Sequence, residues 1–253
     1  MIIITNYKMN RSIDDIKVYK FLKKIKNTHP DPELSSFIVK KVIDNTLYIT
    51  TDEMINNINI LIDNFHRDYK EYNLFIPKIK IGSEHLILSE VYKKLHPTQI
   101  IYGYDDKIVN NLPILIIDDA IYSNVNICYH VDELMCNNKG QTNIFIALVC
   151  LSSNNNNCQF TKHYRGTIYA THYLEDLQIH KLLGEKYDDD YVYDNFGIEA
   201  TCILPVYFDH KIANNMGSYQ FYHQLIKNPI DRSHIDKITW KMIEYIIKYL
   251  IKK

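Results

Sequence analysis

The sequence predicts an α/β fold in which a central, mostly parallel sheet is flanked by helices, with extra elements at both ends of the chain. Short apolar runs without polar alternation, such as residues 114–117 and 143–151, are typical of strands covered on both faces of a parallel sheet. Between residues 47 and 170 such runs alternate with segments whose apolar residues recur at helical spacing. This alternation indicates consecutive strand and helix units around one sheet.

Length and charge limit the classes of function. At 253 residues the chain is long enough for one large α/β domain or two small ones. Its formal net charge of −1 argues against a nucleic-acid-binding surface, because such surfaces concentrate Lys and Arg. The densest interior basic cluster, Lys23, Lys24 and Lys26, is interpreted as the solvated face of a helix. We therefore expect no nucleic-acid partner.

The cysteines and the hydropathy pattern indicate the compartment. The five cysteines are widely spaced and form no Cys-x-x-Cys pair, which disfavours both a disulfide framework and a structural zinc site. No apolar stretch approaches the length of a membrane span, and Met1 to Ile4 is too short for a secretory signal. We expect a cytoplasmic protein with no membrane partner. The bias toward Ile, Asn, Lys and Tyr is typical of AT-rich genomes, such as those of some large DNA viruses or protists, and for a viral protein the location becomes the host cytoplasm.

The first elements follow from caps and apolar stripes. Residues 1–45 are expected to form an N-terminal helical extension, in which one helix ends before Pro30. Residues 47–50 are predicted to form a strand, and Thr50 with Glu53 forms a capping box for the next helix. That helix carries an apolar stripe typical of a packing surface, formed by Ile55, Ile58, Leu61, Ile62 and Phe65.

The rest of the predicted core, which spans residues 46–186, repeats the same units. Helices are expected after Ser83, after Asn126 and near residues 173–183, and residues 103–111 form a polar connection. Strands are predicted at residues 73–77, 99–102, 114–117, 143–151 and 167–170.

The last part of the chain, residues 187–253, is less regular. Residues 200–208 are predicted to form a strand that ends in the polar triplet 209–211, which faces either a site or solvent. The acidic run 187–191 lacks the ligand spacing of a calcium loop, so an exposed loop is preferred to a metal site. A terminal helix should dock through an apolar stripe formed by Ile238, Met242, Ile243, Ile246, Ile247, Leu250 and Ile251.

The most informative segment is the apolar run 114–117, which ends in two adjacent carboxylates. A buried strand that meets Asp118 and Asp119 should stop there, so we expect both side chains at the carboxyl edge of the sheet, where open α/β folds bind their ligands. The polar loop that follows opens a helix, and its backbone amides suit a phosphate. The alternative is that the two aspartates cap the next helix or merely end the strand.

The order of strand, Asp118-Asp119, two spacer residues, small polar loop and helix resembles the phosphoribosyl-pyrophosphate loop of type I phosphoribosyltransferases. The resemblance is close over Leu112 to Asn126 and loose over half of the chain. It implies a phosphoribosyltransferase-like core of Rossmann-type topology, in which the terminal segments form a hood over the base. It also implies that Asp118 and Asp119 hydrogen-bond the ribose 2′ and 3′ hydroxyls. By the same resemblance the 5′-phosphate is bound by Tyr122, Ser123, Asn124, Val125 and Asn126.

Two residues of this loop depart from the family pattern. Asn124 stands where the family has a glycine, which allows positive φ and a close approach of the phosphate. Tyr122 is much bulkier than the usual threonine. Both departures fall in the loop that would hold the phosphate.

A second candidate loop, residues 78–83, lies between a predicted strand and a helix. A strand, a Gly-Ser turn and a helix start form a potential anion seat. In the family the corresponding early loop holds pyrophosphate, so the resemblance implies this role for Lys80, Gly82 and Ser83; the alternative is a plain turn. It further implies Mg²⁺ bound through the ligand's pyrophosphate, with no metal held by the protein alone, and a lid near residues 103–111.

Two hypotheses of function follow from the resemblance. The first is a Mg²⁺-dependent enzyme that transfers phosphoribose between pyrophosphate and a base, which needs positioning and charge neutralisation rather than a nucleophilic side chain. The second is a protein of the same fold that binds phosphoribosyl pyrophosphate or a nucleoside monophosphate for regulation, without turnover. The partner is in either case a sugar phosphate or nucleotide, and a homodimer is left open.

Overall fold

The computed structural model divides the chain into two compact units, Met1–Thr50 with Leu174–Arg232 and Thr51–Tyr173 with Ser233–Lys253. This division differs from the expected one, since residues 233–253 group with the α/β core instead of with the preceding C-terminal segment. The structure describes residues 19–20, 23, 31–78, 80–121, 129–134, 143–152, 166–174, 206–209, 211–212 and 232–252.

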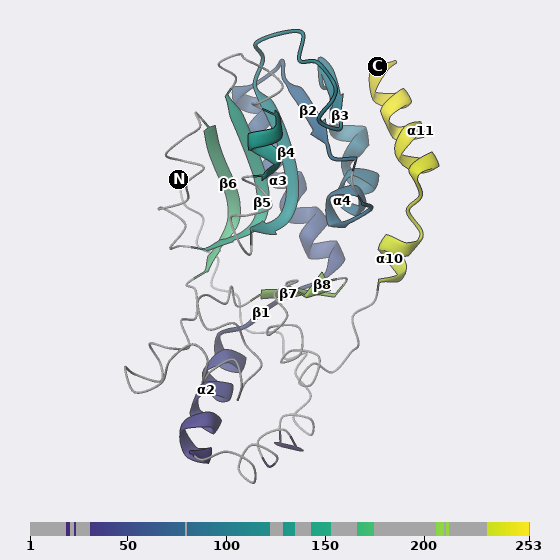
Figure 1. The fold of residues 1–253 in the computed structure, drawn as a ribbon. Helices are drawn as coiled ribbons and strands as arrows, with labels where there is room; N and C mark the ends of the chain where they lie inside the picture. The colour runs from purple at the N-terminus through teal and green to yellow at the C-terminus, as the bar shows by residue number, and fades with distance from the viewer. Residues whose placement is uncertain are drawn as a thin grey trace. The chain divides into compact units, whose positions relative to one another are not determined.

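The second unit contains a five-stranded sheet in the order β3-β2-β4-β5-β6 (Figure 1). β2 is parallel to both β3 and β4, and β4 is parallel to β5, which confirms the α/β class and the parallel character of the sheet. The strands are β2 (Asn73–Ile76), β3 (Gln99–Tyr102), β4 (Ile114–Ile121), β5 (Ile144–Ser152) and β6 (Gly166–Leu174).

The central strands lie in the core, as their unalternating apolar runs predict. All four residues of β2 are buried. Phe75 of β2 packs in one cluster with Ile114 and Ile116 of β4 and with Ile144 and Ile146 of β5. Burial on both faces of a strand is the arrangement that helices on either side of a parallel sheet produce.

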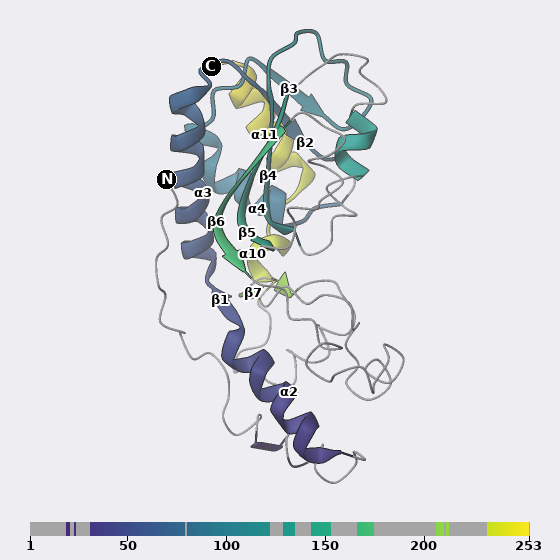
Figure 2. The same cartoon turned by 90° about the vertical axis from the view of Figure 1, so that its left-hand side faces the viewer.

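Helix α3 (Thr51–Asp68) runs alongside this sheet and packs against β5 (Figure 2). Because α3 begins at Thr51, Thr50 lies at the N-cap position, as the sequence predicts. Phe65 meets Phe145 of β5 at a ring-centroid distance of 5.5 Å. Each fully buried side chain of this kind stabilises the fold by about 1.5–3 kcal/mol. The buried residues are Met54, Ile58, Leu61, Ile62 and Phe65, which confirms the predicted stripe except that Met54 is buried in place of Ile55.

This unit also contains α4 (Ser83–Val91) with the 3₁₀ turn η1 (Tyr92–Lys94), α10 (Ser233–Asp236), α11 (Trp240–Ile251) and the helical residues 129–134. α11 packs against α4 and β3 and buries Ile243, Ile246 and Leu250, so the terminal helix docks as predicted. Two residues of the predicted stripe are instead exposed, Met242 by 42% and Ile251 by 70%. No helix in the described part of the chain has the length and hydropathy needed to cross a membrane.

The first unit contains α2 (Pro32–Asn45) and a three-stranded sheet in the order β1-β7-β8. β1 (Leu47–Ile49) is parallel to β7 (Val206–Phe208), and β7 is antiparallel to β8 (Lys211–Ile212). The expectation that the strand at residue 47 belongs to the sheet of the core is therefore wrong. A strand of three residues carries no local signal for its partner, which here comes from far along the chain.

Several predicted elements end elsewhere or lie outside the described residues. β6 continues to Leu174, so the helix expected near residue 173 does not begin there, because the apolar and polar residues of this segment continue a strand. The acidic run 187–191, the beginning of the strand predicted at 200–208 and most of residues 1–30 lie outside the described part.

Candidate functional site

The strand order places a reversal of the sheet between β2 and β4. From β2 the chain adds β3 on one side, and it then crosses back to place β4 on the other side of β2. At such a reversal the connections leave the two neighbouring strands in opposite directions and open a crevice at their carboxyl ends. Both loops singled out in the sequence follow these two strands.

Asp118 and Asp119 lie within β4 and not after it. Ile114 is level with Asn73 in the pairing of β4 with β2, so β2, which ends at Ile76, stops before the level of Asp118. On the other side Asp118 still pairs with β5. The predicted end of the strand before the aspartates is therefore wrong, because β5 continues to satisfy the backbone of β4 after its side chains become polar. Toward β2, both residues do lie beyond the carboxyl end.

The two carboxyl groups differ in burial. Asp118 is half-buried, whereas Asp119 is 0% exposed. Asp118 Oδ1 accepts the Asp119 amide hydrogen at 2.8 Å, and Asp119 Oδ1 accepts that of Ala120 at 2.7 Å. Burial, reinforced by the Asp119 charge, raises the pKa of the Cys150 thiol well above its ordinary value. Asp119 thus holds backbone inside the sheet, and Asp118 is the carboxylate within reach of a ligand.

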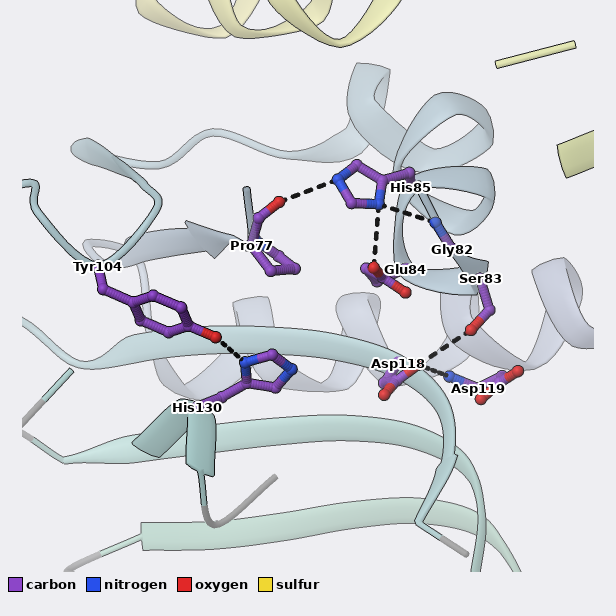
Figure 3. A network of polar contacts seen from close by, with 9 residues as sticks. All are labelled: Pro77, Gly82, Ser83, Glu84, His85, Tyr104, Asp118, Asp119 and His130. Carbon is purple, nitrogen blue, oxygen red and sulfur yellow. Dashed lines mark hydrogen bonds and ion pairs between the residues drawn. The ribbon is translucent and has the colours of Figure 1, made fainter. Parts of the chain in front are cut away.

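Ser83 connects the second candidate loop to this carboxylate. Its Oγ donates to Asp118 Oδ1 at 3.3 Å, and the Ser83 side chain is buried at the first position of α4 (Figure 3). Gly82 is the N-cap of α4, and Lys80 is exposed. The structure therefore brings Ser83 and Asp118 together, as a shared binding site requires.

His85 fixes the turn between β2 and α4. Its ring is 0% exposed and meets Trp240 edge to face at 5.2 Å. His85 Nε2 lies 3.0 Å from the Pro77 carbonyl oxygen, which can only accept, so Nε2 carries a hydrogen. His85 Nδ1 then accepts the Gly82 amide hydrogen at 3.2 Å. One imidazole thus joins both ends of the candidate pyrophosphate loop.

Glu84 approaches the same ring nitrogen. Its Oε1 lies 3.0 Å from His85 Nδ1, a contact that is attractive only if Nδ1 carries a proton. The bond from Gly82 requires an unprotonated Nδ1, so the two contacts do not form at once. We assign Nδ1 as the acceptor for Gly82, because the backbone amide is fixed and the Glu84 carboxylate ends a flexible side chain.

Tyr104 and His130 form a hydrogen-bonded pair that the sequence did not reveal. Tyr104 follows β3, and His130 lies in the helical segment 129–134; the hydroxyl contacts His130 Nδ1, and the rings stack at 5.9 Å (Figure 3). Burial lowers the pKa of His130 below its ordinary value of 6.5, while the Glu84 charge acts in the opposite direction. Burial, with the Tyr129, Glu133 and Glu84 charges, raises the Tyr104 pKa. No motif joins residues so far apart in the sequence.

The structure describes only part of the expected site. The candidate phosphate-binding residues, Tyr122, Ser123, Asn124, Val125 and Asn126, lie outside the described part. Within the described residues, no three His, Cys, Asp or Glu side chains gather as they would around a metal ion. Mg²⁺ was expected through a ligand's pyrophosphate and stays a prediction.

Comparisons with known proteins leave the family open. No protein-family model matches this chain, and no curated protein does so. A solved structure described as a hypothetical protein from Neisseria gonorrhoeae with bound ppGpp shares 13% identity over 55% of this chain and 94% of that chain, with a TM-score of 0.33. A likeness at this level has no bearing on function.

Proposed function

We propose that the protein binds a phosphorylated ribose, as phosphoribosyl pyrophosphate or as a nucleoside 5′-monophosphate, at the carboxyl edge between β2 and β4. The observation that supports this most is the hydrogen bond from Ser83 to Asp118, which joins the start of α4 to β4 at the reversal of the sheet. Asp118 is half-buried and lies beyond the end of β2. A carboxylate in this place accepts hydrogen bonds from the vicinal hydroxyls of a ribose.

In this proposal, different parts of the site bind different groups of the ligand. Asp118 fixes the ribose hydroxyls, and the loop after β4 supplies amides for the 5′-phosphate, as the family resemblance implies. If the protein is a transferase, a diphosphate at ribose C1 leaves toward the start of α4, and Mg²⁺ bound through that diphosphate supplies charge neutralisation. Catalysis then depends on the position of ribose relative to the incoming base.

A second candidate is a protein that binds the same ligands without turnover. The observation that favours it is the Glu84 carboxylate, which follows the candidate pyrophosphate loop at the second position of α4. A negative charge beside that loop opposes the binding of a second anion. The two candidates differ in whether a nucleotide product forms.

Calorimetric titration with ribose 5-phosphate, and with phosphoribosyl pyrophosphate and Mg²⁺, tests the proposal. Asp118→Asn should abolish measurable binding, alone or with Asp119→Asn, while the melting temperature of the single variant stays near that of the wild type. The matched control is Asp68→Asn, which changes an exposed carboxylate at the end of α3. Unchanged affinity in Asp118→Asn would overturn the proposal. Chromatography of mixtures with the common bases then separates turnover from binding.

A further inference from the structure

Residues 103–111, called the connecting strap below, carry the chain from the end of β3 toward the start of β4. Parallel strands are usually joined by a crossover that contains a helix, and the strap contains none. Gln99 of β3 and Ile114 of β4 are both level with Asn73 of β2, which lies between these strands. The strap therefore has to return along the length of β3 and cross β2 before β4 begins.

Side-chain hydrogen bonds at both ends of β3 hold the strap on its return. Asp106 Oδ2 accepts the Tyr102 amide hydrogen at 2.7 Å. Gln99 Nε2 donates to the Lys107 carbonyl at 2.6 Å, and Gln99 Oε1 accepts the Val109 amide hydrogen at 3.1 Å. β3 is the outer strand of the described sheet, so the bond to Tyr102 also satisfies a backbone group at an open edge.

A pair of asparagines holds the end of the strap. Asn110 Oδ1 accepts the Leu112 amide hydrogen at 3.0 Å and an Asn73 Nδ2 hydrogen at 2.7 Å. Asn73 is fully buried at the start of β2. The last residues of the strap are therefore fixed to a strand of the core.

The strap also covers apolar surface of the sheet. Tyr104 and Ile108 pack against the core cluster that contains Phe75, and the Tyr104 ring lies 5.5 Å from the Phe75 ring. Val131, from the helical residues 129–134, belongs to the same cluster and is fully buried. Movement of the strap away from the sheet would expose this apolar surface to water, which opposes such movement.

Tyr104 links the strap to the helical residues 129–134. Its hydroxyl contacts His130 Nδ1 (Figure 3), and both rings also lie beside the Phe75 ring. Burial raises the pKa of Tyr104 and lowers that of His130, so both groups are uncharged at neutral pH. An uncharged phenol and an uncharged imidazole can bond with either as the donor, and either bond joins the two segments.

We propose that the connecting strap stays closed and that Tyr104 uses it to dock the helical residues 129–134 on the sheet. The family resemblance instead implies a lid near these residues, which opens to admit a ligand. The inference does not depend on which ligand binds at Asp118. It requires that a ligand reach this carboxylate while the strap keeps its position.

Amide hydrogen exchange in the ligand-free protein, followed by NMR, tests whether the strap opens. We expect the Tyr102 and Val109 amides to exchange more slowly than in an unstructured peptide by about tenfold or more, because each is bonded to a side chain in the closed strap. Weaker protection than this at either amide would show that the strap opens often and would overturn the inference.

Two neighbouring carboxylates of the strap provide a matched comparison. Asp106→Ala should speed exchange of the Tyr102 amide by about tenfold, because a hydrogen bond to a charged acceptor is lost. Asp105→Ala removes an exposed carboxylate one residue earlier and should leave that rate within about twofold of the wild type. Equal rates in the two variants contradict the assigned bond and with it the closed strap.

Tyr104→Phe tests the docking, since it keeps the ring and removes the hydroxyl. Exchange of the amides of residues 131–134 should become about fivefold faster, because one hydrogen bond is lost. The amides of α3 should stay within about twofold of the wild type, which separates local release from a loss of global stability. The control Tyr129→Phe makes the same change on a ring that is 49% exposed and meets Tyr104 edge-on, and it should alter neither set.

Three results of this comparison would overturn the docking role. The first is an unchanged rate at residues 131–134 in Tyr104→Phe, and the second is an equal increase in α3. The third is a Tyr104→Phe protein that does not fold, because a bond that docks one segment is not needed by the whole molecule.

Discussion

Ser83 donates its hydroxyl hydrogen to Asp118 across a separation of 35 residues, so the start of α4 and the carboxyl end of β4 are joined by a side-chain bond. The bond ends on the half-buried carboxylate that is proposed to meet a ribose. Its strength thus matters both for the fold and for the orientation of the acceptor.

The first prediction concerns this bond. Ser83→Ala should lower the free energy of unfolding by about 1–2 kcal/mol, because a hydrogen bond to a charged acceptor is lost and the length of the bond places it at the weak end of its class. Urea denaturation measures the change. Ser89→Ala is the control, since its hydroxyl donates to the Leu86 carbonyl within α4, at 2.7 Å. Equal losses in the two variants would show that the contact with Asp118 adds nothing.

The second prediction concerns the ring that fixes the loop. His85→Leu should cost about 2–5 kcal/mol of stability, because the Pro77 carbonyl and the Gly82 amide lose a common partner inside the protein. Thermal and urea denaturation both report the loss. His234→Leu changes an exposed histidine in α10 and should stay within about 0.5 kcal/mol of the wild type. A loss at His85 as small as at His234 would contradict the assigned bonds.

The sequence predicts the strands of the core well because their signal is local. β2 and β3 fall where the short apolar runs 74–76 and 100–102 place them, and all of β2 is buried. The partner of β1 and the continuation of β4 through Asp118 both depend on a neighbouring strand. Hydrophobic pattern fixes which segments are strands, while pairing depends on contacts between segments distant in the chain.

The site shows the same division. The meeting of Ser83 with Asp118 follows from the expectation that both loops lie at one edge of the sheet. The burial of Asp119 does not follow, because it depends on the overhang of β4 and β5 beyond β2. The pair of Tyr104 and His130 joins two connections that carry no shared motif, so only coordinates reveal it.

The third prediction separates the two aspartates. Asp119→Ala should destabilise the protein by about 1–3 kcal/mol, because the buried Ala120 amide loses its acceptor. Asp119→Asn retains a side-chain oxygen in this place and should cost clearly less. Urea midpoints of both variants and of Asp118→Asn provide the measurement. If Asp118→Asn is the least stable of the three, the assignment of Asp119 to structure and Asp118 to binding is reversed.

The fourth prediction is that stability falls as the pH drops below 6.5. Burial is the largest cause that lowers the pKa of His66, His130 and His172 from the ordinary value of 6.5. At pH values between 6.5 and those lowered pKa values, the unfolded chain binds more protons than the folded protein. The free energy of unfolding therefore increases with pH in this range. The contribution of the three rings is complete above pH 6.5 and is lost as the pH falls toward their pKa values in the folded protein. Carboxylates contribute little in this range, because their ordinary pKa values lie near 4.

Urea midpoints measured from about pH 7.5 to about pH 5.5 bracket the ordinary histidine pKa and test this dependence. His66 is the most informative single substitution, because its Nε2 lies 3.0 Å from the Tyr72 hydroxyl, which also accepts the His96 amide hydrogen at 2.9 Å. An unprotonated Nε2 accepts the Tyr72 hydroxyl hydrogen, and protonation of His66 removes that acceptor. His66→Gln should therefore reduce the slope, and replacement of the exposed His234 by Gln should not. A midpoint that stays constant or rises on acidification contradicts the burial of these rings as the cause.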